Sequence, residues 1–222
     1  MGYQLDFGAL VQYLGLFLEG MAVTLGLTAV ASIIGVGLGI AGAAAHGGKF
    51  IWVRRSIAGY VELIRNTPFI VQMFFIFFGL PSMGLRLSAL QAAALAMTIN
   101  LTAYAIEIIR AGLEAVPAGQ REAARSMGLR ALPVFGLIVL PQALANVYPA
   151  LVGQITITML ESAVVSQIAV VDLTHVADFI QSRNFRSFET YLVITFIYLG
   201  LAVLMRRGLA FAGRGLFAGR AR

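Results

Sequence analysis

Two carboxylates, Glu107 and Glu161, each follow a long stretch of sequence without any charge. An ionisable side chain inside a membrane costs about 3 kcal/mol, so such residues are usually functional or internally paired. A carboxylate in this setting would pair well with an ammonium or guanidinium group. Uncharged polar residues accompany both carboxylates. The candidate binding positions are Asn100, Thr102, Tyr104, Glu107, Glu161 and Ser162.

Glu107 has a second interpretation. Arg110 follows it at a spacing that places both side chains on one helical face, so the two could form a salt bridge at the membrane interface. The spacing of Asn100, Tyr104 and Glu107 also favours one shared face, which is what a binding position requires. The residues alone leave both alternatives open.

The elements that must position these residues are apolar helices. Hydrophobic residues make up 59% of the 222 positions and charged residues only 12%, which indicates lipid as the solvent. Five stretches approach the roughly 20 apolar residues that cross a bilayer. They are not strands, because barrel strands alternate apolar and polar residues and these do not. The expected spans are 14–45, 57–80, 87–109, 146–171 and 190–206, all in one domain of residues 1–222.

The basic residues predict the orientation. Positively charged segments stay on the cytoplasmic side during insertion, so the N-terminus is expected outside and the C-terminus in the cytoplasm. The segments assigned to the cytoplasm contain Lys49, Arg54, Arg55, Arg110, Arg121, Arg125, Arg130, Arg206, Arg207, Arg214, Arg220 and Arg222. The opposite loops contain only Arg86, Arg183 and Arg186. The net charge of +6 is therefore explained by topology, since nucleic-acid binding would require one basic face with stacking aromatics.

Several chemistries are not indicated. There is no cysteine, and His46 and His175 are far apart, so no metal-ligand spacing is present. The glycine-rich stretch Gly35 to Gly42 lacks the Lys and Ser/Thr of a phosphate-binding loop, and its small residues favour close helix packing. No cofactor is expected on this chain, and any nucleotide-driven step must use another chain.

The segment from Gly112 to Pro141 carries the most specific pattern, GLEAVPAGQREAARSMGLRALPVFGLIVLP. It resembles the EAA loop of ABC-importer permeases, and the PAGQREAA portion is similar to the polar amino acid branch of that family. The run RNTPFIVQ from Arg65 and the element AYAIEIIR from Ala103 resemble two further family segments. Asn66 replaces the commoner glycine, and Leu160 or Glu161 stands where the family usually has a lysine.

The resemblance implies a type I ABC importer permease fold with five transmembrane helices and no catalytic residue on this chain. It implies that the loop is a coupling helix that docks on an ATPase. The residues that inherit this role are Gln120, Glu122, Ala123, Ala124, Gly128, Leu140 and Pro141. The implied partners are an ABC ATPase dimer carrying ATP and Mg, a second permease subunit, a substrate-binding protein and a polar amino acid in the bacterial inner membrane. A plain interfacial helix on lipid headgroups is the alternative for this loop.

Two other classes of protein are compatible with an apolar helical chain. A self-contained channel or secondary carrier would favour several buried charges along an ion path, whereas this sequence has two candidates. A noncatalytic membrane scaffold would leave Glu107 and Glu161 unexplained. The ordered set of motifs favours the importer subunit.

Overall fold

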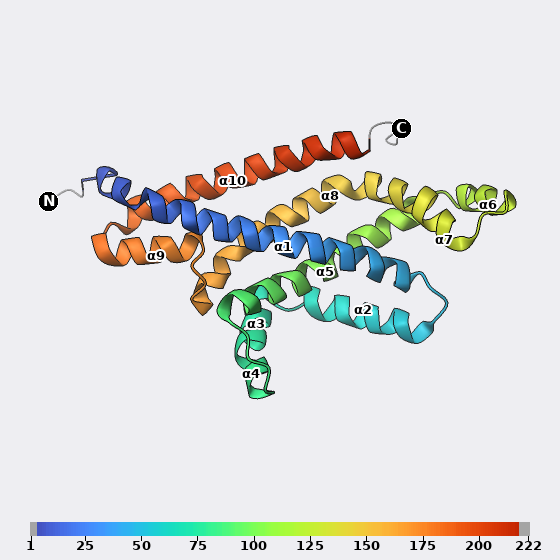
Figure 1. Ribbon diagram of the computed structural model, residues 1–222, viewed down its shortest axis with the longest axis horizontal. Coiled ribbons are helices and arrows are strands. Elements are labelled where there is room, and N and C mark those ends of the chain that lie inside the picture. Colours follow the sequence, from blue (N-terminus) through green and yellow to red (C-terminus); the bar gives the residue numbers. More distant parts are fainter. Residues whose placement is uncertain (1–3, 218–222) are drawn as a thin grey trace.

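The computed structural model describes residues 4–217 as an elongated bundle of helices (Figure 1). Arg220 and Arg222 lie outside the described residues. Within them, every regular element is helical: η1 Gly8–Tyr13, α1 Leu14–His46, α2 Ile51–Arg65, α3 Phe69–Phe74, η2 Phe75–Gly79, α4 Leu80–Ser82, α5 Ala89–Ala115, α6 Ala118–Ser126, α7 Ala131–Pro133, η3 Val134–Val139, α8 Leu140–Glu161, η4 Ser162–Ile168, α9 Leu173–Asn184 and α10 Ser187–Leu216.

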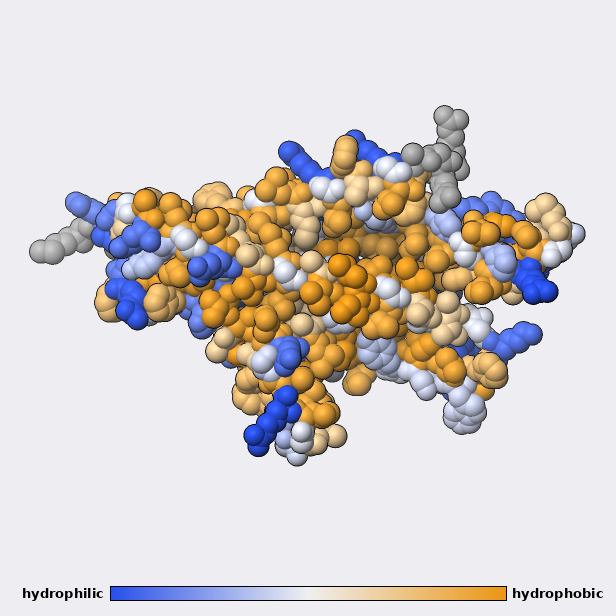
Figure 2. Space-filling view, in the orientation of Figure 1, coloured by the Kyte–Doolittle hydropathy of each residue, from blue (hydrophilic) through white to orange (hydrophobic). Residues whose placement is uncertain are grey.

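Four continuous helical stretches are long and apolar enough to cross a membrane: 8–46, 89–115, 131–168 and 187–216. A fifth span is present only if the bent pair 51–65 and 69–82 counts as one. Hydrophobic residues cover the middle of the molecule, whereas hydrophilic residues gather toward its two ends (Figure 2). The helical, membrane-spanning class expected from composition is therefore confirmed.

The second apolar segment is not the single helix 57–80 that the sequence analysis expected. It starts earlier, at Ile51, and breaks after Arg65, where α2 and the following helical piece meet at 108°. Pro68 explains the break, because proline lacks the N–H that would continue the ladder and disfavours helical geometry in the residue before it. The short arm α3–η2–α4 consequently leaves the bundle at its side (Figure 1).

Two other segments are longer than expected. The fourth, expected from Asn146, begins as helix at Ala131 and reaches Ile168 through a π-helical portion and a final 3-10 turn. The fifth, expected over 190–206, runs from Ser187 to Leu216. Charged and proline residues mark where lipid becomes unfavourable, but a helix can continue into water beyond that point.

Prolines also explain the two π-helical segments. Each lies immediately before a helix with proline in its first turn: Phe75–Gly79 precedes Pro81, and Val134–Val139 precedes Pro141. A proline ring clashes with the carbonyl four residues earlier. Widening the preceding turn relieves that clash without ending the helix.

Helix α1 packs along α5 through glycines. A Cβ added at Gly39 would lie 2.5 Å from the Cβ of Ala105, and one at Gly42 would lie 2.6 Å from Cδ1 of Ile106. A Cβ at Gly37, on the opposite side of α1, would meet nothing within 4 Å. The glycine-rich stretch therefore lets α1 and α5 approach closely, which is a common way for membrane helices to pack.

Hydrogen bonds at the start of α9, around the buried Asp172, join this helix to α1 and α10. Asp172 caps α9, with Oδ1 accepting from the backbone N–H of His175 at 2.9 Å, and the Tyr198 hydroxyl donates to Oδ2 at 3.2 Å. The backbone N–H of Leu173 donates to Oγ1 of Thr24 at 3.3 Å. Asp172 is fully buried. Burial raises its pKa above the ordinary value, and hydrogen bonds to the carboxylate offset part of that rise.

Candidate functional site

The expected coupling segment forms a short helix, α6, between two turns. Pro117 lies at the N-cap and the helix proper begins at Ala118. Gly128 ends the turn that follows, with a φ of +81° that side chains other than glycine rarely adopt. Gly128, one of the residues expected in the coupling segment, thus ends the turn that follows Ser126.

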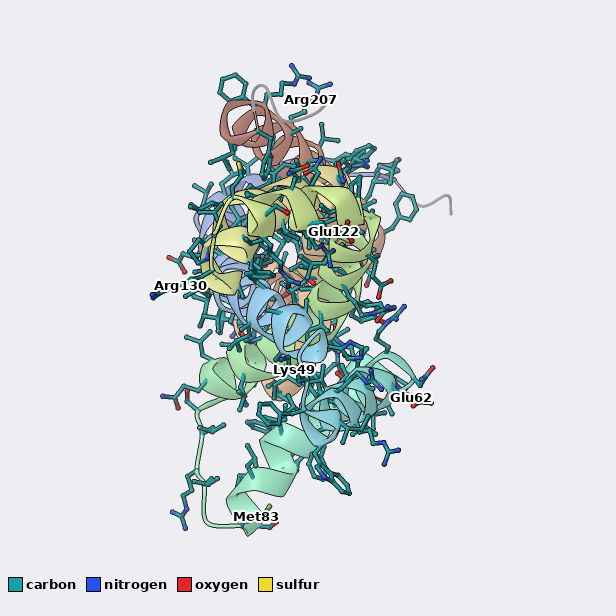
Figure 3. The ribbon with its side chains drawn as sticks, turned by 90° about the vertical axis from the view of Figure 1, so that its right-hand side faces the viewer. Lys49, Glu62, Met83, Glu122, Arg130 and Arg207 are labelled. Carbon is teal, nitrogen blue, oxygen red and sulfur yellow. The ribbon has the colours of Figure 1, made fainter. Side chains whose placement is uncertain are left out.

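The two faces of α6 differ. Ala124 is 1% exposed and packs with Val116, Val134, Val139 and Ala143. Its side chain therefore anchors α6 to this chain and is not presented to a partner. The other sides of α6 are open: Gly119, Glu122 and Ala123 are exposed, and so is Gln120 one turn before Ala124. Glu122 points outward at the end of the bundle that also carries Lys49 and Arg130 (Figure 3).

Helix α6 is also tied to the start of α8. The side-chain amide of Gln142 donates to Oε1 of Gln120 at 2.6 Å, and Arg121 donates to the carbonyl of Leu113. Leu140 and Pro141 are half-buried in the first turn of α8, beside this contact. A force on α6 would thus reach both α5 and α8.

A polar cavity of about 490 Å³ lies between α2 and α5 and the end of α1. Tyr104 and Glu107 line it together with His46, Arg65 and Arg110. The Arg65 guanidinium lies 5.4 Å from the Tyr104 ring centroid, a cation–π contact. Glu107 forms a salt bridge to Arg110 at 2.5 Å. Of the two interpretations of Glu107, the structure therefore shows the salt bridge to Arg110.

Asn100 belongs to a different, closed network at the bend of the second segment. Its side-chain amide donates to Oε1 of Gln72 at 3.0 Å, and Asn100 is 3% exposed. The Gln72 amide in turn donates to the carbonyls of Ile64 at 2.7 Å and Thr67 at 3.0 Å. These are carbonyls that the break leaves without helical partners. Asn100 and Gln72 thus hold the bend against α5.

Glu161 ends α8 and is half-buried. Unlike Glu107, it forms no hydrogen bond or ion pair with any residue in the 4–217 range. Ser162 beside it is fully buried, and its hydroxyl donates to the carbonyl of Met159 at 2.7 Å. Among the expected binding positions, Glu161 is therefore a charged residue without a partner in the described part of the chain.

The six expected binding residues do not form one cluster. Gly112 of α5 packs on Ala143 at the start of α8, whereas the beginning of α5 packs with η4, so the two helices run antiparallel. Glu161 therefore lies toward the beginning of α5, and Glu107 lies in its other half. Thr102 is buried between them and donates to the carbonyl of Thr98 at 2.7 Å.

The sequence analysis did not select Gln72 or Arg65 as site residues. Gln72 lies in an apolar run, and a glutamine in such a run is itself a signal, because a buried amide needs partners. Arg65 entered the sequence analysis only as the first residue of the RNTPFIVQ run. Its contact with Tyr104 depends on how α2 packs along α5. That packing cannot be predicted from a local sequence pattern.

These features define a class of protein: a multi-pass helical membrane protein with polar positions inside its bundle and a short, exposed helix between two spans. Within the part of the chain that is described, no group of three or more His, Asp and Glu side chains could hold a metal ion. Such an arrangement can bind a molecule inside the bundle and transmit motion of the exposed helix to the spans.

Comparisons with known proteins agree with this class. The family described as "binding-protein-dependent transport system inner membrane component" matches residues 33–216. The arginine transport system permease protein ArtQ of Bacillus subtilis is 33% identical over 205 residues, which cover 90% of this chain and 92% of that protein. The probable glutamine ABC transporter permease protein GlnM of the same organism is 38% identical, covering 71% of this chain and 73% of its own.

Solved structures show the same fold. A chain in the crystal structure of an amino acid ABC transporter with histidines superposes with a TM-score of 0.86 at 39% identity, covering 96% of this chain and 99% of that one. A chain of the MetNI methionine ABC transporter in an inward-facing conformation superposes with a TM-score of 0.73 at 21% identity, which supports the fold alone.

The chain therefore belongs to the family of binding-protein-dependent transport system inner membrane components. It is a permease subunit of a bacterial ABC transport system and a multi-pass protein of the inner membrane. Members of this family are not enzymes and hold no cofactor of their own; they work with an ATPase and a binding protein.

Proposed function

We propose that this chain is the translocation subunit of an importer for a polar amino acid, delivered by a binding protein outside the membrane. The observation that carries the proposal is the agreement between the structural match at 39% identity, to an amino acid ABC transporter, and the relatives named for arginine and glutamine transport. ATP and Mg act on the partner ATPase.

The proposed arrangement has the N-terminus outside, the C-terminus in the cytoplasm and the bent pair counted as a fifth span. The positive-inside rule supports it, because Lys49, Arg130 and Arg207 then all lie on the cytoplasmic side. Five spans cannot divide into two equal halves around a translocation pathway. Two permease subunits, identical or similar, would therefore surround that pathway together.

The exposed face of α6 is the proposed docking surface for the ATPase. Gln120, Glu122 and Ala123 would contact the partner, while Ala124 anchors the helix to this chain. Closure of the ATPases on nucleotide would move α6, and the Gln120–Gln142 contact would pass that motion to α8. The bundle then changes between inward- and outward-facing states by population shift.

For the substrate, Glu161 favours an amino acid with a cationic side chain. Its carboxylate is half-buried and unpaired within residues 4–217, whereas Glu107 is engaged by Arg110. An ammonium or guanidinium would supply the missing opposite charge in a charge-assisted hydrogen bond. The family's usual lysine is absent at this position, so an anionic side chain would find no opposite charge here.

The test is copurification with the cognate ATPase, followed by binding-protein-stimulated ATP hydrolysis and amino acid uptake in liposomes. Ala123→Asp places a charge on the exposed face of α6, and Ala212→Asp places the same charge on exposed α10 as a matched control. We expect Ala123→Asp to lose ATPase copurification and the control to keep it. Gly128 is unsuitable, because any side chain there strains the turn.

Two results would contradict the proposal. Uptake by the wild-type chain without any ATPase would identify a channel or secondary carrier. Binding of a cytoplasmic partner without stimulated hydrolysis or uptake would identify a scaffold.

A further inference from the structure

A groove of about 780 Å³ separates α8 from the second half of α10. It is visible as a hollow below α10 in the space-filling view (Figure 2). Pro149, Val152 and Gly153 form its α8 wall, and Val203 and Ala210 of α10 face them. This portion is apolar.

Three arginines of α10 line the same groove: Arg206, Arg207 and Arg214. Together with Val203, Ala210 and Gly213 they repeat at intervals of three and four residues, which places them on one side of the helix. The positive-inside rule explains arginines at this end of α10, but not why three of them border one groove.

These arginines have no carboxylate partner in the part of the chain that the structure describes. Arg206, Arg207 and Arg214 form no hydrogen bond or ion pair within residues 4–217. The sequence has no acidic residue after Glu189 and none from 131 to 160, so neither wall of the groove can supply one. Within residues 4–217 the groove therefore presents three positive charges without a partner beside an apolar cleft.

The depth of the arginines matches the edge of the hydrocarbon. Helix α10 has 30 residues, or about 45 Å at 1.5 Å per residue, against about 30 Å of hydrocarbon. About 20 residues counted from Ser187 reach Arg206 and Arg207. Because α8 and α10 are antiparallel neighbours, Val203 and Gly153 lie on the membrane side of these arginines, and Arg214 lies beyond them.

The far end of the groove is held closed by aromatic contacts. The Tyr148 hydroxyl donates to the carbonyl of Leu209 at 2.7 Å, and the Tyr148 and Phe217 rings meet edge-on at 5.2 Å. Gly213 allows this approach, since a Cβ there would lie 2.2 Å from the Tyr148 ring. The groove is thus a built feature of the α8–α10 pair.

We propose that this groove binds one anionic phospholipid, with its phosphate among Arg206, Arg207 and Arg214 and an acyl chain between Gly153 and Val203. Arginine recognises phosphate through paired N–H donors, and basic pockets between membrane helices bind anionic headgroups. An acidic segment of a partner protein fits less well, because the apolar half of the groove would be left unfilled.

The experiment compares lipid retention in the complete chain. The protein is purified, loaded in mixed vesicles with equal phosphatidylglycerol and phosphatidylcholine, and the bound lipids are counted by native mass spectrometry. We expect wild type to retain phosphatidylglycerol. The variant Arg206→Gln/Arg207→Gln/Arg214→Gln should bind it at least five-fold more weakly, since one basic residue near an anionic surface is worth about that factor.

Two further variants separate a specific groove from general attraction. Lys49→Gln/Arg54→Gln/Arg130→Gln removes the same charge from exposed positions outside the groove and should retain the lipid. Gly153→Leu keeps the charge but fills the acyl position, where an added Cβ meets nothing within 4 Å, and should lose it.

The proposal is overturned if both triple variants lose lipid equally, or if Gly153→Leu has no effect. Displacement of the lipid by inorganic phosphate alone would show that the groove binds anions but has no site for an acyl chain. A cross-link from Ala210→Cys to another protein subunit in the assembled transporter would show that protein occupies the groove.

Discussion

At the scale of single residues, the two membrane carboxylates have different surroundings. Glu107 is neutralised by Arg110 at 2.5 Å, and Arg110 also pairs with Glu114 at 2.5 Å. Glu161 has no such partner within residues 4–217. A buried charge without a partner is costly in the resting protein. In the proposed function, the opposite charge of a bound cationic substrate would offset that cost.

Glu161→Gln removes the charge while nearly keeping the shape. A hydrogen bond to a charged group contributes about 1.5–3 kcal/mol, so we expect uptake efficiency for arginine to fall by about ten-fold or more. Uptake in proteoliposomes measures this, with Glu19→Gln, an exposed acid of α1, as the matched control. Equal uptake of arginine by Glu161→Gln and wild type would remove Glu161 from the pathway.

Asp172 predicts a pH dependence of stability. Burial raises its pKa above the ordinary 3.8. A carboxyl with a raised pKa in the folded state favours folding when protonated, so its contribution is complete below the ordinary pKa and is lost as pH rises through the folded one. Asp172→Asn cannot ionise and keeps the acceptor for the His175 N–H.

We therefore expect Asp172→Asn to gain thermal stability over wild type as the pH is raised from about 4 to about 7. Thermal unfolding in detergent across that range measures the difference between the two proteins. A difference that stays constant with pH would mean that ionisation of Asp172 does not contribute.

At the scale of elements, the pairing of α1 with α5 depends on which side of α1 each glycine occupies. Gly39 touches α5, and Gly37, two residues away, faces outward. The same substitution therefore places a side chain against α5 at Gly39 and in open space at Gly37. Because helix propensity changes equally at both, the comparison isolates packing.

Gly39→Leu should lower stability by about 1–3 kcal/mol, the usual cost of overpacking a close contact, whereas Gly37→Leu should be neutral or stabilising. The midpoint of thermal unfolding, with wild type alongside, measures both. Equal destabilisation by the two variants would contradict the α1–α5 interface described above.

At the scale of the whole molecule, the proposed orientation can be tested with cysteine, because the natural sequence contains none. Met83 is 74% exposed beyond the end of α4, and Lys49 is exposed in the turn between α1 and α2. These two positions lie on opposite sides of the membrane in the proposed arrangement.

A membrane-impermeant maleimide should label Met83→Cys in intact spheroplasts and Lys49→Cys only after the membrane is opened. Labelling is measured by gel shift, and the cysteine-free wild type gives the background. The reverse pattern would invert the proposed topology, and with it the assignment of α6 to the cytoplasm.

The amino-acid sequence by itself determined the class of protein, most of the apolar segments and the position of the short exposed helix. Each residue of a membrane span must be compatible with lipid, so hydropathy and charge along the chain indicate the membrane segments directly. Turn chemistry is local as well, and a glycine such as Gly128 is typical of the turn that ends a helix.

Only the tertiary structure decided which side chains meet. It separated Glu161 from Glu107, turned Ala124 inward, placed Gln72 across the bend and brought three arginines of α10 to the border of one groove. Each of these depends on contacts between residues far apart in sequence, and helical periodicity gives a residue's face without naming what packs against that face.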